Sequence, residues 1–397
     1  MNVSNGFDRC NNGIIGLCKH LHFTFKENAV SFGNPYSSLK VFHHQEKLDQ
    51  LKRGQQIVPT QMQLIISDLC NQDCSFCAYR MSGYTASELF TKDTELAVVG
   101  TNNPKRQLTK SKVFEILDDC AEMGIKAVQF TGGGEPTVHP DFAEVYEYAL
   151  SKGLIPALVT NGLLLQKHIP LVAESAWVRV SIDAGTPASY ASIRRVPEAQ
   201  YDRVWRNIEK LVEQKKKYKK DGLIIGAGFV VTAENWHEVL LFTQRARQAG
   251  VDNVRFSGVF QPDDDAYFDS FYEAASKLCK QCKDLETHDF KVFNLFGDRV
   301  EDLREHSPDY MFCGYQEFNT YVGGDLNVYR CCVQSYSTHG LVGSLKEQRF
   351  KELWESKEKK DDFAGFCATS CNRCQFNEKN RTILYALSTD PMHVDFV

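Results

Sequence analysis

From Gln63 onward, short apolar runs alternate with longer segments of helical period, and this alternation limits the possible folds more than any other feature. Such alternation is typical of βα units, in which helices connect the parallel strands of one sheet. Six runs fit strands, at residues 64–66, 127–130, 156–159, 178–182, 224–231 and 253–256. Five segments fit helices, at about 109–123, 141–152, 164–174, 199–219 and 234–249.

Six βα units are too few to close a barrel of eight strands. We therefore predict an α/β fold, a partial (βα)6 TIM-like barrel with its site at the C-terminal ends of the strands. Another helix is expected over 263–290, and from Cys313 short strands, turns and cysteines follow. The predicted parts are an N-terminal extension over 1–58, the partial barrel over 59–300, and a small cysteine-rich domain of β-hairpin and helix over 301–397.

The charge balance argues against a large surface for nucleic acid. The formal net charge is -5, whereas nucleic-acid-binding domains are commonly basic. The basic run 215–220 is expected at the solvated end of a helix. No apolar run approaches the ~20 residues that cross a bilayer, and residues 1–10 lack the basic and apolar regions of a signal peptide. We therefore expect a cytoplasmic protein that makes no membrane contact.

The chain contains 14 cysteines, and in a reducing compartment metal or redox chemistry explains them better than disulfides. Cys10, Cys18 and Cys120 stand apart, so we expect them to be ordinary buried residues. Cys279 and Cys282 fall in a helical segment without a second pair beside them. For this pair we expect a solvent-facing helix.

Three cysteines, Cys70, Cys74 and Cys77, follow the first predicted strand within one short loop. Three thiolates can hold three irons of a cubane [4Fe–4S] cluster, and the fourth iron then has no protein ligand. A structural zinc site is the alternative, but it takes four ligands, and this loop offers no fourth Cys or His. The spacing therefore favours a cluster with one open iron.

The spacing Cys70-x3-Cys74-x-Phe76-Cys77 resembles the signature of the radical S-adenosylmethionine (SAM) superfamily, and the resemblance extends from about Gln61 to Ser257. It implies that the open iron chelates SAM. One electron then cleaves SAM to methionine and a 5′-deoxyadenosyl radical, which removes a hydrogen atom from the substrate. The resemblance also implies a reductant such as flavodoxin or ferredoxin. The cofactors carry the difficult chemistry, and the protein orients them.

A glycine-rich turn, Gly132, Gly133, Gly134 and Glu135, follows the second predicted strand. Glycines let the backbone approach a ligand closely, and a carboxylate can accept hydrogen bonds from an ammonium group. The turn is similar to the GGEP motif of the family, which contacts the amino group of the methionine part of SAM.

Other polar residues follow the third and fourth predicted strands. The resemblance assigns Asn161 to the family's TNG motif. It places Ser181 and Asp183 at the ribose and methionine of SAM, and it pairs Arg194 with the SAM carboxylate. Arg195 is the alternative, because the pattern does not rank two adjacent arginines. Two apolar residues, Val230 and Phe256, are candidates for contact with adenine, although such residues in strands are more often core.

Six further thiols lie near the C-terminus: Cys313, Cys331, Cys332, Cys367, Cys371 and Cys374. The stretch 323–332 reads as a β-hairpin, and a helix with Trp354 follows; both resemble the SPASM or "twitch" auxiliary-cluster domains of the family. This resemblance implies one auxiliary [4Fe–4S] cluster. Its preferred ligands are Cys313, Cys331, Cys371 and Cys374, and Cys332 or Cys367 could replace one of them. A zinc ribbon is the alternative.

An auxiliary cluster implies an oxidoreductase or maturase that acts on a peptide or small molecule, with net oxidation or cross-linking. One alternative is a radical SAM enzyme that modifies RNA or nucleotides. The other is a non-catalytic iron–sulfur or zinc protein that carries electrons or acts as a scaffold. Such a protein would need neither the glycine turn 132–135 nor Arg194. Neither the general acid or base nor the substrate can be chosen from the sequence.

Overall fold

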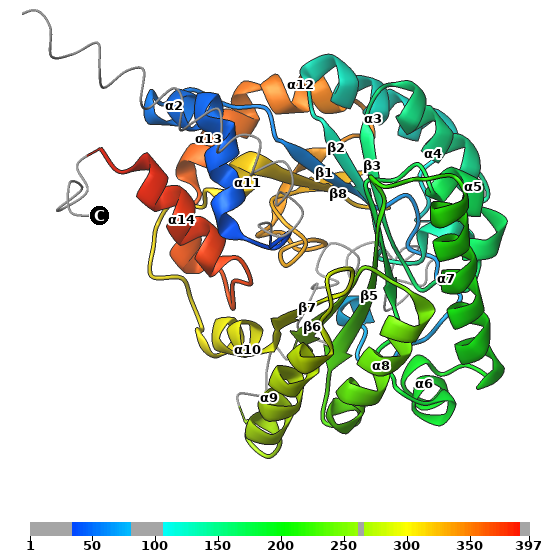
Figure 1. The fold of residues 1–397 in the computed structure, drawn as a ribbon. Helices are drawn as coiled ribbons and strands as arrows, with labels where there is room; N and C mark the ends of the chain where they lie inside the picture. The colour runs from blue at the N-terminus through cyan, green and yellow to red at the C-terminus, as the bar shows by residue number, and fades with distance from the viewer. Residues whose placement is uncertain (1–33, 81–105, 261–265, 390–397) are drawn as a thin grey trace, which may run out of the picture. The chain divides into compact units, whose positions relative to one another are not determined.

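The computed structural model describes residues 34–80, 106–260 and 266–389 (Figure 1). The chain divides into two compact units, residues 1–44 and 45–397. The described part of the first unit contains the short 3-10 helix η1 (Ser38–His44). Cys10 and Cys18 lie outside the described residues.

The second unit is built on one sheet, which in the described residues has ten strands in the order β10-β9-β8-β1-β2-β3-β4-β5-β6-β7. Seven of them are parallel and adjacent in chain order, as in a barrel built of successive βα units. They are β1 (Gln61–Leu64), β2 (Ala127–Phe130), β3 (Ile155–Thr160), β4 (Trp177–Ser181), β5 (Ile224–Val231), β6 (Asn253–Gly258) and β7 (Lys291–Leu295).

Helices connect the parallel strands and begin and end where the sequence provides capping residues. The Thr109 side chain accepts the Lys112 N–H at the start of α3, and Gly124 ends this helix with φ 83°. The basic run ends α7 with exposed lysines, as predicted. The helices are α3 (Lys110–Met123), α4 (Phe142–Ser151), α5 (Ile169–Val172), α6 (Pro187–Arg194), α7 (Ala199–Lys217), α8 (Val239–Ala249), α9 (Tyr272–Gln281) and α10 (Phe296–Arg304).

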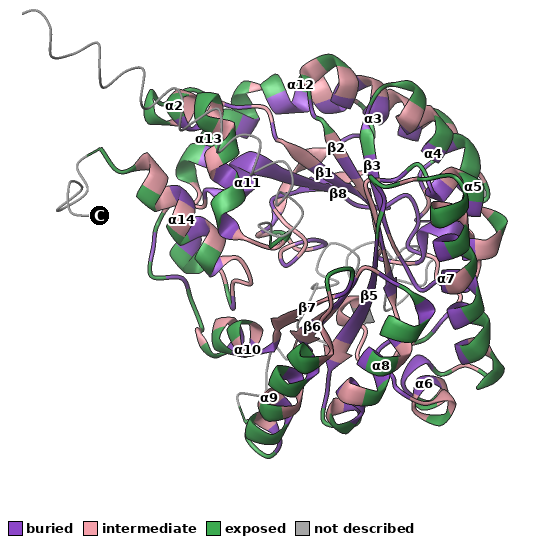
Figure 2. Ribbon diagram, viewed as in Figure 1, coloured by how far each residue is buried: buried purple, intermediate pink, exposed green. Residues whose placement is uncertain are grey.

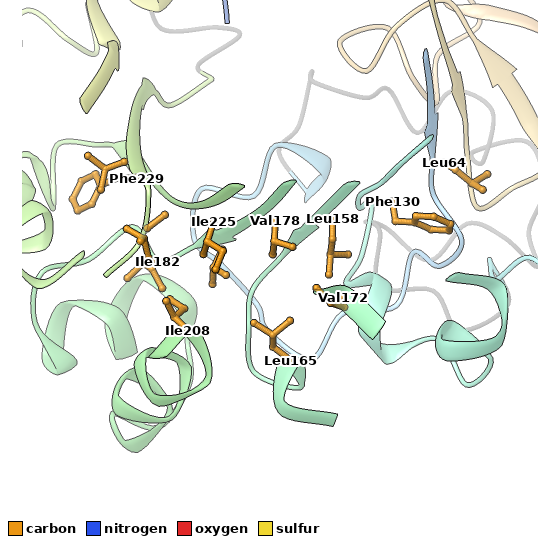
Figure 3. Packing of buried hydrophobic residues seen from close by; sticks show 14 of the residues in the cluster. Leu64, Phe130, Leu158, Leu165, Val172, Val178, Ile182, Ile208, Ile225 and Phe229 are labelled. Atoms are coloured by element: carbon orange, nitrogen blue, oxygen red, sulfur yellow. The ribbon is translucent and has the colours of Figure 1, made fainter. Parts of the chain in front are cut away.

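The main core lies between the strands and these helices. Alternate strand residues point to the helices and are fully buried, and their neighbours point to the opposite face of the sheet. Figure 2 shows the complementary pattern on the helices, whose exposed residues face outward. Figure 3 shows part of this core: Leu64, Phe130, Leu158, Leu165, Val172, Val178, Ile182, Ile208, Ile225 and Phe229.

The C-terminal segment extends the same sheet. Strand β8 (Asn319–Val322) pairs in parallel with β1, and β9 (Asn327–Tyr329) returns antiparallel to β8. A hairpin thus forms as predicted, but its first strand lies before the predicted stretch 323–332. Because the sheet continues across residue 300, the domain boundary placed there stays a prediction. The remaining elements are β10 (Leu341–Ser344), α2 (Gln45–Lys52), α11 (Tyr315–Phe318), α12 (Phe350–Glu355), α13 (Lys357–Gly365) and α14 (Asn377–Leu387).

The segment after β6 differs from the sequence prediction. The helix expected over 263–290 is the shorter α9, followed by the 3-10 helix η7 (Cys282–Leu285) and by strand β7, which was not predicted. The prediction that Cys279 and Cys282 face solvent was wrong, since both are fully buried in the main core. Ala275, Cys279 and Cys282 are spaced four and three residues apart, so they share the buried face of the turns that carry them. Within the described ranges, no helix has the length and apolarity to span a membrane.

Candidate functional site

The cysteine loop, residues 67–77, leaves the C-terminal end of β1, and Cys70, Cys74 and Cys77 are partly exposed in it. Burial, together with the nearby Cys74 and Cys70 thiolates, raises the pKa of the Cys77 thiol to about 12. A metal ion would reverse this effect, because it stabilises the thiolate form. In the described parts of the chain, no three His, Cys, Asp or Glu side chains already stand arranged to hold a metal. The three thiols therefore stay predicted ligands.

The end of helix α6 holds the cysteine loop. The backbone N–H groups of Asp73 and Ser75 donate to the carbonyls of Arg194 and Ile193 at 3.2 and 2.8 Å. These carbonyls belong to the last turn of the helix, which has no partners of its own for them. The Arg194 side chain also donates through Nη1 to Cys74 Sγ at 3.2 Å. A cation thus lies directly beside one of the three predicted ligands.

Arg194 and Asp183 form a buried ion pair. Arg194 Nη2 donates to Asp183 Oδ2, while Asp183 Oδ1 accepts the Val230 N–H at 2.6 Å. Burial raises the pKa of Asp183, and the Arg194 charge opposes that rise. The Arg194 Nε is buried without a hydrogen-bond partner among the described residues, so one donor is left for a bound anion.

The structure distinguishes the two adjacent arginines. Arg194 is the last residue of α6 and is 5% exposed, whereas Arg195 takes the left-handed conformation with φ 53° and faces solvent. Arg195 pairs with exposed Asp73 at 3.3 Å. The change of backbone conformation after the helix therefore turns the second side chain away from the site.

We expect Arg194→Gln to lower the free energy of unfolding by about 3–5 kcal/mol, because it leaves Asp183 charged and buried without its cation. Arg195→Gln is the matched control, and we expect it to cost no more than about 1 kcal/mol because an exposed pair is screened by water. Guanidinium unfolding of both variants under anaerobic conditions measures the difference. Equal losses of stability in the two variants would contradict this assignment.

The glycine turn after β2 packs directly against the cysteine loop. Gly134 N–H donates to the Ser67 carbonyl at 3.1 Å, and Glu135 N–H donates to the Leu69 carbonyl at 2.9 Å. A Cβ on Gly134 would overlap the Leu69 carbonyl, and one on Gly132 would overlap the Gly134 carbonyl. The absence of side chains is therefore a steric requirement of this turn, and the turn fixes the backbone that leads into Cys70.

The Glu135 carboxylate, 2% exposed, joins the ends of two strands. Its Oε1 accepts the Thr137 N–H and the hydroxyls of Thr137 and Thr160, and its Oε2 accepts the Asn161 N–H at 2.7 Å. Burial raises the pKa of Glu135, and these hydrogen bonds oppose the rise. Oε2 accepts only this one bond in the described structure, so it retains capacity for an ammonium donor.

Two more predicted residues lie at the same edge of the sheet. The Asn161 side chain donates to Asn71 Oδ1 at 2.7 Å, which ties the end of β3 to the cysteine loop. Ser181 is the last residue of β4 and is half-buried, and it lies on the strand face opposite Val178 and Val180. The structure therefore brings Asn161 to the cysteine loop and leaves Ser181 on the face that points away from the helices.

The predicted aromatic and apolar contacts divide between the two faces of the sheet. The Arg194 guanidinium lies 5.8 Å from the centre of the Phe76 ring. Val230 is half-buried on the face opposite Phe229, but Phe256 is fully buried and packs edge-on against Phe229 and Phe242 beside the helices. Phe256 is therefore a core residue and not an adenine contact.

The four preferred C-terminal ligands lie near one another. Burial raises the pKa of Cys331 and Cys371, and the nearby thiolates of Cys313 and Cys374 add to both shifts. Cys374 Sγ also accepts the Phe376 N–H at 3.4 Å, the kind of bond that tunes iron–sulfur clusters. These four cysteines thus stay the predicted ligands of an auxiliary cluster.

The two alternative ligands differ in their surroundings. Cys332 packs against the cluster of Tyr321, Tyr329 and Tyr336, and burial raises its pKa. Cys367 Sγ lies 3.0 Å from the Thr369 hydroxyl, and this bond lowers the pKa of the partly exposed thiol. Cys367 is therefore the more accessible of the two.

Three functional candidates in the cysteine loop itself were missed: Asp68, Asn71 and Gln72. Gln72 donates to the Tyr190 hydroxyl at 2.8 Å and accepts from Arg194 at 3.4 Å. Polar residues in such a loop look like ordinary loop residues in a sequence, and no spacing marks their partners. The only sequence signal was position: Asn71 and Gln72 lie between Cys70 and Cys74, and Asp68 lies two residues before Cys70.

The face of the sheet opposite the helices also carries charge. Arg179 on β4 and Arg255 on β6 lie on this face, and both flank β5, whose residues there include Gly226 and Gly228. A Cβ on Gly228 would lie 3.4 Å from the Arg179 Cδ. Gly228 thus leaves room above β5 for the Arg179 side chain, whereas Gly226 faces Asn253.

Comparison with known proteins supports this description. Residues 64–242 match the model of the Radical SAM superfamily. An S-adenosylmethionine-dependent nucleotide dehydratase of Flammeovirga pacifica is 29% identical, over 49% of this chain and 60% of that protein. The AdoMet-dependent heme synthase of Methanosarcina barkeri is 26% identical, over 64% and 75%. The chain thus spans less than two thirds of the dehydratase.

A solved structure supports the fold. Streptococcus suis SuiB bound to its precursor peptide SuiA superposes with a TM-score of 0.55 at 14% identity, over 87% of this chain and 78% of that chain. This likeness supports the fold alone, a partial TIM-like barrel.

The cofactors of this family, a [4Fe–4S] cluster and SAM, fit the residues present. The thiols provide cluster donors, the glycine turn provides a cradle that a Cβ would fill, and the Arg194 Nε provides a buried donor. The Glu135 carboxylate adds an acceptor for a positively charged group, such as the amino group of SAM. Residues 64–242 of this chain form a domain of the radical SAM superfamily.

Proposed function

We propose that this chain cleaves SAM reductively and removes a hydrogen atom from a peptide or small-molecule substrate. The observation that carries the proposal is the clamping of the cysteine loop on two sides, by the glycine turn and by Arg194. A [4Fe–4S] cluster with SAM supplies the electron and the 5′-deoxyadenosyl radical for this reaction. The protein supplies binding, orientation and exclusion of water.

The residues of this chain take separate roles at SAM. Glu135 accepts from the amino group, and Arg194 donates to the carboxylate while Asp183 fixes its guanidinium. Ser181 faces the ribose from the end of β4. The roles of Glu135 and Arg194 follow from charge complementarity, because charge-assisted hydrogen bonds are stronger than neutral ones.

An auxiliary [4Fe–4S] cluster on Cys313, Cys331, Cys371 and Cys374 completes the proposal. Four thiolates saturate a cluster, so this one would have no iron open to SAM or to substrate and would serve to accept an electron. That role makes the reaction a net oxidation or a cross-linking step. A reductant such as flavodoxin or ferredoxin would supply the electron for SAM cleavage, in the reducing compartment of the cytoplasm.

Two classes of substrate are favoured by different observations. A peptide is favoured by the likeness in fold to SuiB, which was solved with a precursor peptide. A nucleotide is favoured by the sequence likeness to a nucleotide dehydratase and by Arg179 and Arg255 on the inner face of the sheet. Nucleoside triphosphates and a peptide fraction, each added separately to the enzyme with SAM, discriminate between the two classes. The class of substrate that is consumed only when SAM is present is the one on which the enzyme acts.

Release of 5′-deoxyadenosine tests the proposed function. We expect anaerobically reconstituted protein with SAM and dithionite to release 5′-deoxyadenosine and methionine in equal amounts, as chromatography would show. Protein without iron is the control and should release neither. A protein that holds its cluster but releases neither compound would instead be an electron carrier or a scaffold.

A further inference from the structure

Asp68 lies two residues before Cys70, and three segments meet at its fully buried carboxylate. Oδ1 accepts the Tyr336 hydroxyl at 2.6 Å, and Oδ2 pairs with Arg106 Nε at 3.0 Å. A Cβ on Gly133 would overlap Oδ1, so the glycine turn closes over the same group. The carboxylate thus contacts the glycine turn and adjoins the predicted cluster ligands.

Tyr336 brings the C-terminal cysteine region to this point, since it follows Cys332 by four residues. Its hydroxyl also accepts the Gly324 N–H at 3.3 Å, in the turn of the β8–β9 hairpin. The Tyr336 backbone has φ 60°, the left-handed region. A residue other than glycine adopts this conformation at a cost of about 1–3 kcal/mol and keeps it where its surroundings impose it.

The other end of the cysteine loop touches the same segment. Tyr79, two residues after Cys77, shares a 3.2 Å hydrogen bond between hydroxyls with Tyr321 of β8. Its ring also packs edge-on against Tyr336, with centroids 6.2 Å apart. Both ends of the loop are therefore held by side chains that adjoin the second group of cysteines.

We propose that the Tyr336–Asp68 hydrogen bond is a positioning contact that couples the C-terminal cysteine site to SAM binding. The inference rests on the proposed function. Metal on Cys331 restrains the segment that ends at Tyr336, because ligand binding and local folding are linked. The restrained hydroxyl fixes Asp68, and Asp68 fixes the cysteine loop and the glycine turn. Coupling of this kind is reciprocal, so SAM also favours the filled C-terminal site.

Tyr336→Phe removes the hydroxyl and keeps the ring. We expect it to weaken SAM binding to anaerobically reconstituted protein about tenfold, the effect of losing one charge-assisted hydrogen bond. Equilibrium dialysis with labelled SAM measures the Kd, while iron content and Tm show that the protein is loaded and folded. Tyr329→Phe is the matched control. Tyr329 belongs to the same tyrosine cluster, but its hydroxyl donates to Asp325, at 2.6 Å, and not to Asp68. Its SAM Kd should stay unchanged.

A double-mutant cycle with Cys331→Ser tests the coupling itself. We expect Cys331→Ser also to weaken SAM binding, and Tyr336→Phe to add little in that background, since residues that act through one contact are not additive. Independent, multiplying effects would overturn the proposal, as would a Tyr336→Phe protein that binds SAM like wild type. If wild type binds SAM but releases no 5′-deoxyadenosine, the proposed function fails. The ratio of the SAM Kd of Tyr336→Phe to that of wild type would still show whether the Tyr336–Asp68 contact supports SAM binding.

Discussion

Replacing Cys74 by Ala is expected to remove the SAM-binding cluster and abolish 5′-deoxyadenosine release. Two thiols do not hold the three irons that a site-differentiated cubane requires, and the change also removes the sulfur beside Arg194. Iron analysis of the anaerobically reconstituted variant should show a loss of about four irons per chain relative to wild type. Chromatography of the reaction should show no nucleoside product.

Cys120→Ala is the control for this experiment. Cys120 is fully buried in the main core, where its thiol lies 3.6 Å from the Met62 sulfur. Loss of that thiol should leave both iron content and SAM cleavage at the wild-type level. A Cys74→Ala protein that still cleaves SAM would contradict the assignment of the cysteine loop.

The second large effect is expected from Cys371→Ala. This variant should keep the cluster of the cysteine loop and release 5′-deoxyadenosine, but it should lose substrate product, because the auxiliary cluster loses a ligand. Product is followed by mass spectrometry, in parallel with 5′-deoxyadenosine. The two measurements separate the two steps, since SAM cleavage should persist while product formation falls to background.

Cys367→Ala is the matched control, since the partly exposed Cys367 thiol bonds only to nearby Thr369 in the described structure. It should keep both the auxiliary iron and the product. Loss of product in Cys367→Ala but not in Cys371→Ala would show that Cys367, and not Cys371, is the ligand of the auxiliary cluster. Normal product formation in Cys371→Ala would exclude the auxiliary cluster from the reaction.

Much of the barrel could be predicted because its signals are local. Helix α3 has a capping Thr109 and a terminal Gly124, and its apolar period lies between them. Strand β7 was missed because Lys291 and Asn294 interrupt its short apolar run. Cys279 and Cys282 were predicted to face solvent because no second cysteine pair lies beside them. Their spacing from Ala275, which places all three on one buried face, was the signal that was overlooked.

The contacts that position the site were less accessible to sequence reasoning. The motif resemblance indicated the glycine turn and Arg194, but the choice between Arg194 and Arg195 depends on where helix α6 ends. The Asp68 partner Tyr336 lies 268 residues away in the sequence. A hydrogen bond over such a separation leaves no local pattern, so only the folded chain reveals it.

We propose that three thiols of one loop hold an iron–sulfur cluster with an iron open to SAM. Metal analysis with Mössbauer and EPR spectroscopy tests it on anaerobically reconstituted Cys371→Ala protein, in which the C-terminal set is incomplete. We predict a [4Fe–4S] signal whose EPR spectrum, after reduction, changes when SAM is added. Zinc at the loop, or no metal there, would contradict the account.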